Sequence, residues 1–327
     1  MDQRTGTMER LPPLQLRRLR GLDLTESPGG GRGAHIASAS GVVRRGDFVY
    51  VIGDDELYLG VFRMSVPEPG EPVRVLDGNL PEDAEARSDA KPDLEALTML
   101  PPFRGHAYGA LLGLGSGSGP DRDRGFVWAL NHDGSLRGEV RDLDLAPLFE
   151  RLRDDIDGLN IEGACVMGDR LWLMHRGNRG GTINVVAELS LERVMDSILG
   201  DSRIDPGELA AMRSYDLGEL DGIELTFSDT TPLGRDLLVF TASAEGSGSD
   251  GPDGAIRGSV VGTIGLDGQV QRLRTIDRRW KVEGVHASID TGVMDLLFVC
   301  DQDDPDEPSP LLSAAMPLEG GFESEED

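Results

Sequence analysis

Four glutamates with similar flanking residues recur along the chain, and their carboxylates are the groups best suited to chemistry. At intervals of 59 to 67 residues stand Glu95 in Lys91-Pro-Asp-Leu-Glu-Ala-Leu, Glu162 in Asn160-Ile-Glu-Gly, Glu224 in Gly222-Ile-Glu-Leu and Glu283 in Lys281-Val-Glu-Gly. Converging carboxylates can bind a divalent cation, and oxygen ligands in this number suit calcium better than magnesium or manganese. They can also move a proton to or from a bound water. The alternative is that each glutamate is a scaffold residue, because repeats duplicate structural residues as readily as functional ones.

A second polar set follows an apolar stretch downstream of each repeated segment. Its members are Asp54, Asp55, Ser116, His175, Arg176, Asn178, Ser243, Glu245, Asp301, Asp303 and Asp304. Crowded carboxylates must be neutralised by protons, by a bound cation or by the basic residues Lys91, Arg176, Arg179 and Lys281. We expect a ring glutamate or His175 to move the proton, and Arg176 and Lys281 to hold an anionic group. For the aspartate runs, a solvated turn is the alternative.

The elements that must position these residues are short strands in a repeated order. Each copy has an apolar strand, a turn and a second apolar strand, the latter at residues 48–52, 110–114, 171–174, 237–240 and 296–299. A fifth copy, without the glutamate, begins at Ser38-Ala-Ser-Gly. Two more strands follow most copies, for example residues 57–64 and 72–76, or 125–130 and 135–140. Four antiparallel strands per copy predict an all-β fold, a single β-propeller of about five blades.

Ring closure and strand direction decide where the polar residues meet. The start of a first strand and the end of a second antiparallel strand share an edge, so both polar sets are expected on one face of the channel. We expect the N-terminal strand, residues 14–24, to complete the last blade, whose own strands end at residues 311–316, because closure removes exposed edges. Helical spacing predicts short helices at residues 144–155 and 191–199. The propeller should span residues 14–318, between a disordered N-terminus (1–13) and a disordered acidic tail (319–327).

Charge and composition exclude several classes of protein. Acidic residues outnumber basic ones by 59 to 32 and give a net charge of −27, which repels nucleic acid and anionic membranes. Because no apolar run is long enough to span a bilayer and the N-terminus lacks a secretory core, we expect a cytoplasmic protein. Cys165 and Cys300 lie in apolar strands and are expected to be buried free thiols. Oligomeric state is left open.

The quoted motifs, together with Cys300-Asp-Gln-Asp-Asp, resemble those of uncharacterised bacterial propellers related to the phytase-like, esterase-like superfamily, over about residues 36 to 316. In related calcium-dependent lactonases and phytases, carboxylates and amides at the channel mouth hold the metal. The resemblance implies metal-binding roles for Glu95, Glu162, Glu224, Glu283 and Asn178. Those enzymes usually have six blades, whereas this chain has five repeats.

Two functions are consistent with these features. The first is a calcium-type propeller hydrolase in which the metal activates water against a small ester, lactone or phosphoester. The second is a non-catalytic propeller that binds a small molecule or a protein partner on the same face. A catalytic site requires a concave, water-accessible channel mouth, whereas a scaffold ring requires glutamates paired to backbone groups or lysines.

Overall fold

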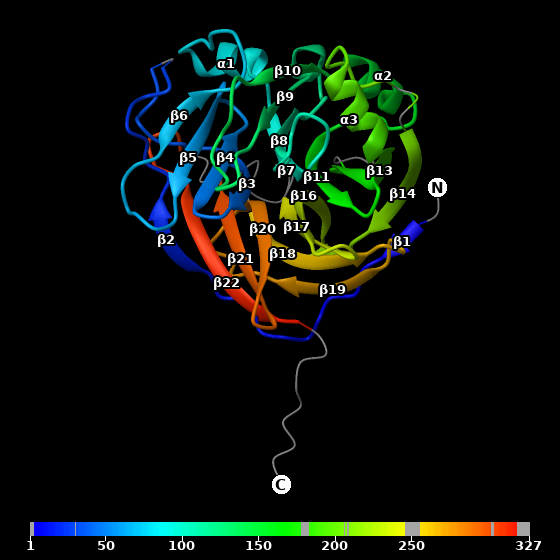
Figure 1. Cartoon of the computed structure of the whole chain (residues 1–327). Coiled ribbons are helices and arrows are strands. Elements are labelled where there is room, and N and C mark those ends of the chain that lie inside the picture. Colours follow the sequence, from blue (N-terminus) through cyan, green and yellow to red (C-terminus); the bar gives the residue numbers. More distant parts are fainter. Residues whose placement is uncertain are drawn as a thin grey trace.

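Five small sheets form a ring in the computed structural model, which describes residues 3–29, 31–177, 183–205, 207, 209–245, 256–301 and 304–318 (Figure 1). Counted outward from the channel, the first four strands of each sheet pair antiparallel. The innermost strand of each sheet contacts the innermost strands of the two neighbouring sheets around the ring. The fold is therefore the predicted five-bladed β-propeller.

Each blade extends from an innermost strand at the channel to an outer strand at the rim. Blade 1 contains β3 (Ala39–Arg45), β4 (Phe48–Gly53), β5 (Tyr58–Arg63) and β6 (Glu71–Arg74). Blade 2 contains β7 (Leu94–Leu100), β8 (Ala110–Gly115), β9 (Arg124–Ala129) and β10 (Arg141–Asp144). Blade 3 contains β11 (Ile161–Met167), β12 (Arg170–His175), β13 (Asn184–Ser190), β14 (Leu209–Asp216) and β1 (Gln3–Thr5). Blade 4 contains β16 (Ile223–Leu233), β17 (Leu237–Glu245), β18 (Ile256–Gly265) and β19 (Val270–Thr275), with β15 (Glu219–Leu220) beside β16. Blade 5 contains β20 (Val282–Asp290), β21 (Val293–Cys300), β22 (Pro310–Pro317) and β2 (Arg17–Gly21).

The apolar core is divided into five layers, one between each pair of adjacent blades. Glycines on the inner strands let neighbouring blades approach closely. A Cβ atom on Gly284 would lie 2.5 Å from Val299 Cγ2 and 2.8 Å from the carbonyl oxygen of Ser40 in the next blade. Cys165 and Cys300 are buried in these layers as free thiols, as predicted.

The N-terminal segment closes the ring and runs along several blades. Strand β2 pairs with β22 and completes blade 5, which confirms the predicted closure. The described part of the segment predicted to be disordered, residues 3–13, instead contains β1, which pairs in parallel with β14. The Glu9 amide also donates to the Leu273 carbonyl. Backbone hydrogen bonds with exposed outer strands thus order a polar segment that has no apolar pattern of its own.

The helices lie in the connections, on one side of the ring in Figure 1. Helices α2 (Ala146–Arg153) and α3 (Leu191–Leu199) confirm the two predictions, whereas α1 (Ala84–Ala90) and the short 3-10 helix at Pro120–Arg122 were not predicted. The strand expected at residues 135–140 is wrong: the chain turns there, and β10 begins at Arg141. Among the described residues, no helix has the length and apolar character needed to cross a membrane. The predicted tail, 319–327, lies outside the described residues.

Candidate functional site

A β-bulge near the start of the innermost strand is present in all five blades. The bulged residues are Ser40, Glu95, Glu162, Ser228 and Glu283. A bulge adds one residue to a strand and changes the direction of its side chain, so it is a common device at functional sites. These five residues are the equivalent positions of the repeat.

Two further polar positions accompany each bulge. One lies two residues before it: Ser38, Asp93, Asn160, Thr226 and Lys281. The other is the facing residue at the end of the second strand: Asp54, Ser116, Arg176, Ser243 and Asp301. The two positions are in contact; for example, the Ser116 amide donates to the Asp93 carbonyl and the Arg176 amide to the Asn160 carbonyl, each at 2.9 Å. All fifteen positions are polar, and the members of the two predicted polar sets that occupy them share one face of the ring.

Glu224 was assigned wrongly as the ring residue of blade 4. It lies four residues before the bulge, is exposed, and pairs with Glu219 in a short hairpin. Ser228 takes the ring position instead. The useful sequence signal was a pair of polar residues two positions apart at the start of each copy, because alternate strand residues share a face. Thr226 and Ser228 fit that pattern, whereas the residue two positions before Glu224 is a glycine, Gly222.

A cavity of about 160 Å³ lies at the channel mouth and gathers most of the remaining predicted residues. Its ionisable lining consists of Asp54, Glu95, Glu162, Arg176, Lys281, Glu283 and Asp301. The structure therefore brings together five of the eight predicted site residues. Asn178 lies outside the described residues.

His175 does not reach this cavity. Its side chain is 1% exposed, and its Nδ1 lies 3.0 Å from the amide nitrogen of Asn160, from which it accepts a hydrogen bond. Burial lowers the pKa of His175 to about 4, so the ring is neutral at physiological pH. The predicted role in proton transfer therefore does not fit its position, because no substrate atom in the cavity could reach the imidazole.

Basic side chains pair with most of the carboxylates at the mouth. Arg176 lies 3.4 Å from Glu162 and 2.9 Å from Glu245. Lys281 lies 2.9 Å from Asp301 and 3.6 Å from Glu283. Both basic residues predicted to bind an anionic group are therefore already engaged with carboxylates of the protein.

Lys91 neutralises the carboxylates on the blade 1 side of the mouth. Its ammonium group contacts Asp54 and lies 2.8 Å from Asp93. Asp93 also accepts a hydrogen bond from Ser116 and forms an ion pair with Arg122 at 3.0 Å. Asp93 was overlooked in the sequence although it stands two residues before Glu95.

Glu95 differs from the other carboxylates of this group. Among the described residues, no basic side chain lies within ion-pair distance of it, and it is partly accessible in the cavity. Burial, followed by repulsion from Glu162, Asp54 and Asp93, raises the pKa of Glu95 well above its usual value, and Lys91 opposes this only in part. Glu95 therefore retains its proton at a pH where an ordinary glutamate is ionised.

Glu162 is held in place and titrates near neutrality. Its two carboxylate oxygens accept hydrogen bonds from Asn160 Nδ2, at 2.5 Å, and from Arg176. Burial raises the pKa of Glu162 to about 7, and Arg176 limits the rise. The pKa of Glu283 is raised by burial as well, against the attraction of Arg176 and Lys281. The cavity thus contains two carboxyl groups with raised pKa values, and Asn160 and Arg176 hold that of Glu162 in a fixed orientation.

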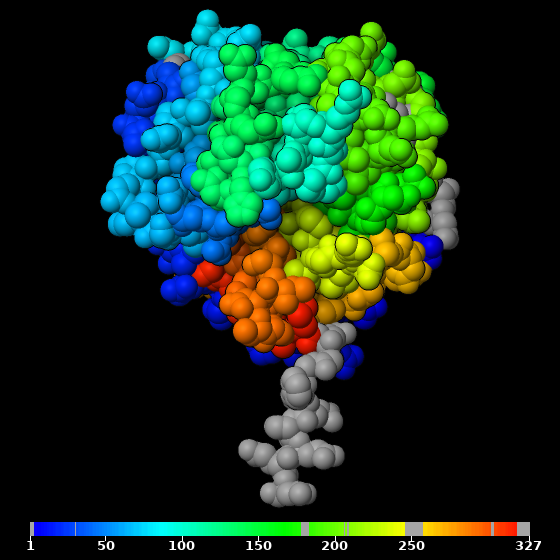
Figure 2. Space-filling model, viewed as in Figure 1, coloured from blue at the N-terminus to red at the C-terminus, as the bar shows by residue number. Residues whose placement is uncertain are grey.

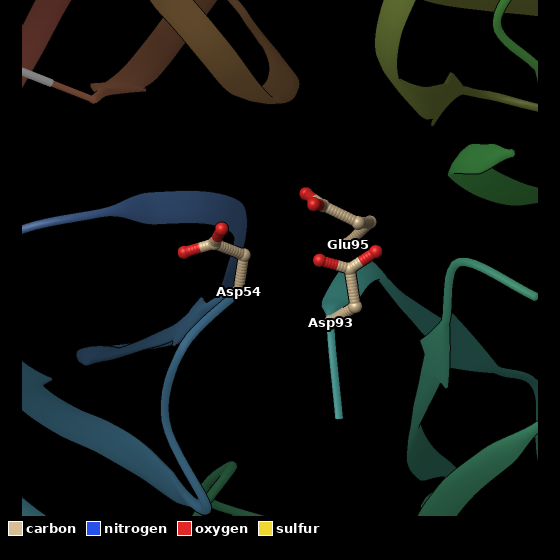
Figure 3. A group of neighbouring side chains, drawn as sticks. All are labelled: Asp54, Asp93 and Glu95. Carbon is tan, nitrogen blue, oxygen red and sulfur yellow. The ribbon is translucent and has the colours of Figure 1, made fainter. Parts of the chain in front are cut away.

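Three carboxylates lie close enough together to be considered as ligands of one metal ion. Oxygen atoms of Asp54, Asp93 and Glu95 lie within 4.8 Å of one another, and Figure 3 shows Asp54 across a gap from Asp93 and Glu95, which lie at the start of β7. Oxygen donors suit calcium. However, the Lys91 ammonium contacts Asp54 and Asp93 directly. This donor set does not fit a divalent cation while Lys91 keeps its position.

The fold and the site together define a five-bladed propeller with a polar, carboxylate-rich cavity at its channel mouth. The chain belongs to the family of unknown function DUF6929, whose model matches residues 35–316. No curated protein sequence matches the chain.

Two glycoside hydrolase structures share the fold. The catalytic domain of the Coprinopsis cinerea GH62 alpha-L-arabinofuranosidase is 11% identical, with 93% of this chain and 96% of that chain covered and a TM-score of 0.51. An engineered GH43 glycoside hydrolase with endo-xylanase and exo-arabinofuranosidase activity is 12% identical, with 97% of this chain and 59% of that chain covered and a TM-score of 0.50. At these identities the likeness establishes the fold alone. The link to the phytase-like superfamily stays a prediction.

Proposed function

We propose that the channel-mouth cavity hydrolyses a glycosidic bond by general acid–base catalysis. Glu95 is the acid and Glu162 is the base. The observation that supports this best is that Glu95, which has a raised pKa and no basic partner among the described residues, shares a cavity with Glu162, a carboxyl group with a pKa of about 7. Environments that give two neighbouring carboxyl groups different protonation states are typical of acid–base pairs.

In the proposed reaction, Glu95 donates its proton to the bridging oxygen of the leaving group while the bond between that oxygen and the anomeric carbon breaks. Glu162 accepts a proton from a water molecule whose oxygen forms the new bond to the anomeric carbon. Each carboxyl group then returns to its starting state by proton exchange with solvent. Asn160 and Arg176 fix the orientation of Glu162, and the paired Asp93 provides negative charge near the proton donor.

The glycosidic bond is favoured over the bonds considered from the sequence for two reasons. The cavity lining is almost entirely hydrogen-bonding, with Ala39 as its one apolar residue, and this suits a hydroxyl-rich substrate. The fold is also shared with proteins whose names describe glycoside hydrolysis. The calcium-dependent hydrolysis of a small ester, lactone or phosphoester stays a prediction, and it requires Lys91 to leave Asp54 and Asp93.

The test is a panel of 4-nitrophenyl glycosides, esters and lactones incubated with the full chain, with a chelator and with added calcium. We expect release of nitrophenol from a glycoside in the presence of chelator, and strong loss of that activity in Glu95→Gln and Glu162→Gln. Hydrolysis of no glycoside would overturn the proposal and favour the non-catalytic binding propeller. Ester or lactone hydrolysis that requires calcium would instead support the metal-dependent hydrolase.

A further inference from the structure

A second, larger cavity opens directly onto the channel mouth. It has a volume of about 490 Å³ and shares Ser38, Asp54 and Asp301 with the inner cavity. Helix α1 forms part of its wall through Ala84, Arg87 and Ser88, and residues 304–306 of blade 5 form another part. The two cavities therefore adjoin, and together they give a path from the surface between blades 1 and 5 toward Glu95.

The inner cavity is closed at its far end. Below the ring of polar residues, the inner strands place buried side chains in every blade, namely Val42, Leu97, Ala164, Thr230 and Val285. A Cβ atom on Gly163 would lie 2.9 Å from the backbone nitrogen of Thr230, so the inner strands of blades 3 and 4 are in close contact. Figure 2 shows the face that carries the β20–β21 hairpin, and side chains fill the centre of the ring there. A long substrate cannot thread through the propeller.

Charge limits what can enter this path. The larger cavity is lined by three basic residues and six acidic ones. Arg32 and Arg87 both contact Asp55, and Lys91 contacts Asp54, so the described basic groups already serve the protein's own carboxylates. The inner cavity has five acidic residues against two basic ones. A phosphate or carboxylate on the substrate would meet net repulsion in the larger cavity, which it must cross to reach Glu95.

We infer that the substrate is an uncharged, hydroxyl-rich chain that enters by its end, an inference that rests on the proposed hydrolysis of a glycosidic bond. The terminal unit occupies the closed inner cavity, the bond to be cleaved lies beside Glu95, and the following units occupy the larger cavity against α1. Each turnover therefore releases one terminal unit, and chains whose terminal unit is anionic are poor substrates.

The experiment uses two tryptophan variants on the same helix. Ala84 and Ala86 are both exposed on α1, but only Ala84 lines the larger cavity. The wild type, Ala84→Trp and Ala86→Trp are assayed with neutral linear oligosaccharides of two to six units and with glycosyl fluorides. Because fluoride is a very small leaving group, a glycosyl fluoride needs only the inner cavity. Products are separated by length at early times.

We expect single units as the first products. Ala84→Trp should lower kcat/KM for oligosaccharides at least about tenfold and leave the glycosyl fluoride within about twofold, and Ala86→Trp should change neither. A matched oligosaccharide ending in a uronic acid should react at least about tenfold more slowly than its neutral counterpart. Early products of mixed length, equal effects of both variants or equal rates for the uronic acid chain would overturn the inference.

The inference and the proposed function fail in different ways. Calorimetric titration of Glu95→Gln with the same neutral chains measures binding without turnover. One outcome is that neutral chains bind, that adding Ala84→Trp weakens this binding, and that the wild type never cleaves these chains. The proposed function is then wrong and the ligand class stands. If the wild type cleaves a bond in a Glu95-dependent manner but only in anionic substrates, the ligand class is wrong and the role of Glu95 stands.

Discussion

Replacement of Glu95 by glutamine removes the transferable proton but keeps the size and polarity of the side chain. General acid catalysis by a positioned group contributes about 10²- to 10⁴-fold to rate. Glu95→Gln should therefore lower kcat for a 4-nitrophenyl glycoside by about this factor, which corresponds to about 3 to 5 kcal/mol of barrier. The loss should be much smaller for a 2,4-dinitrophenyl glycoside of the same sugar, because a better leaving group needs less proton donation.

The same substitution, which lowers the rate, should raise the stability of the fold at alkaline pH. A carboxyl group whose pKa is raised by folding contributes stability below its unfolded pKa, and this contribution is lost as pH rises through the folded pKa. The pKa of Glu95 is raised in the folded protein by burial and by neighbouring carboxylates. Glu95→Gln should accordingly raise the melting temperature relative to wild type at pH 8 and change it little at pH 4.

The control is Glu224→Gln, which removes an exposed glutamate on the same face but outside the cavity. It should change neither rate nor the pH dependence of melting. Steady-state kinetics and thermal unfolding at the two pH values provide the measurements. An equal loss with both leaving groups, or a lower melting temperature at pH 8, would refute the assignment of Glu95 as a protonated general acid.

Four further outcomes are expected. With Glu162 as the base, kcat should fall about fiftyfold between pH 7 and pH 5, because a group with a pKa of about 7 is only about 1% ionised at pH 5; a flat profile would contradict this. Calcium should raise the melting temperature of Lys91→Met more than that of wild type, and an equal rise would support metal binding with Lys91 in place. Asp229→Asn should raise the melting temperature at pH 8 but not at pH 4, since burial raises the pKa of Asp229 well above its usual value; a decrease at both pH values would contradict this. Gly284→Ala should cost about 1 to 3 kcal/mol in a denaturant titration, whereas Gly119→Ala, where a Cβ atom meets no neighbour, should stay within about 0.5 kcal/mol.

The repeat of apolar strands was readable because burial between blades imposes the same pattern in every copy. It predicted the five blades, the ring closure by the N-terminal strand and the face on which the polar residues gather. Helices α2 and α3 were predicted for the same reason, since their apolar faces have helical spacing. Strand β1 was not predicted, because the hydrogen bonds that order it belong to β14, an element far away in the sequence.

By itself, then, the sequence determined the architecture and the chemical character of the channel mouth, because both depend on residue types repeated along the chain. The tertiary structure decided which residues form the site. The position of the β-bulge in blade 4 shows that the ring residue is Ser228 and not Glu224, since one extra strand residue changes which side chain faces the channel. Packing buried His175 away from the cavity. Only the folded positions of Lys91, Arg176 and Lys281 leave Glu95 as the carboxyl group without a basic partner in the described part of the mouth, because an ion pair depends on distances in space and not on spacing along the chain.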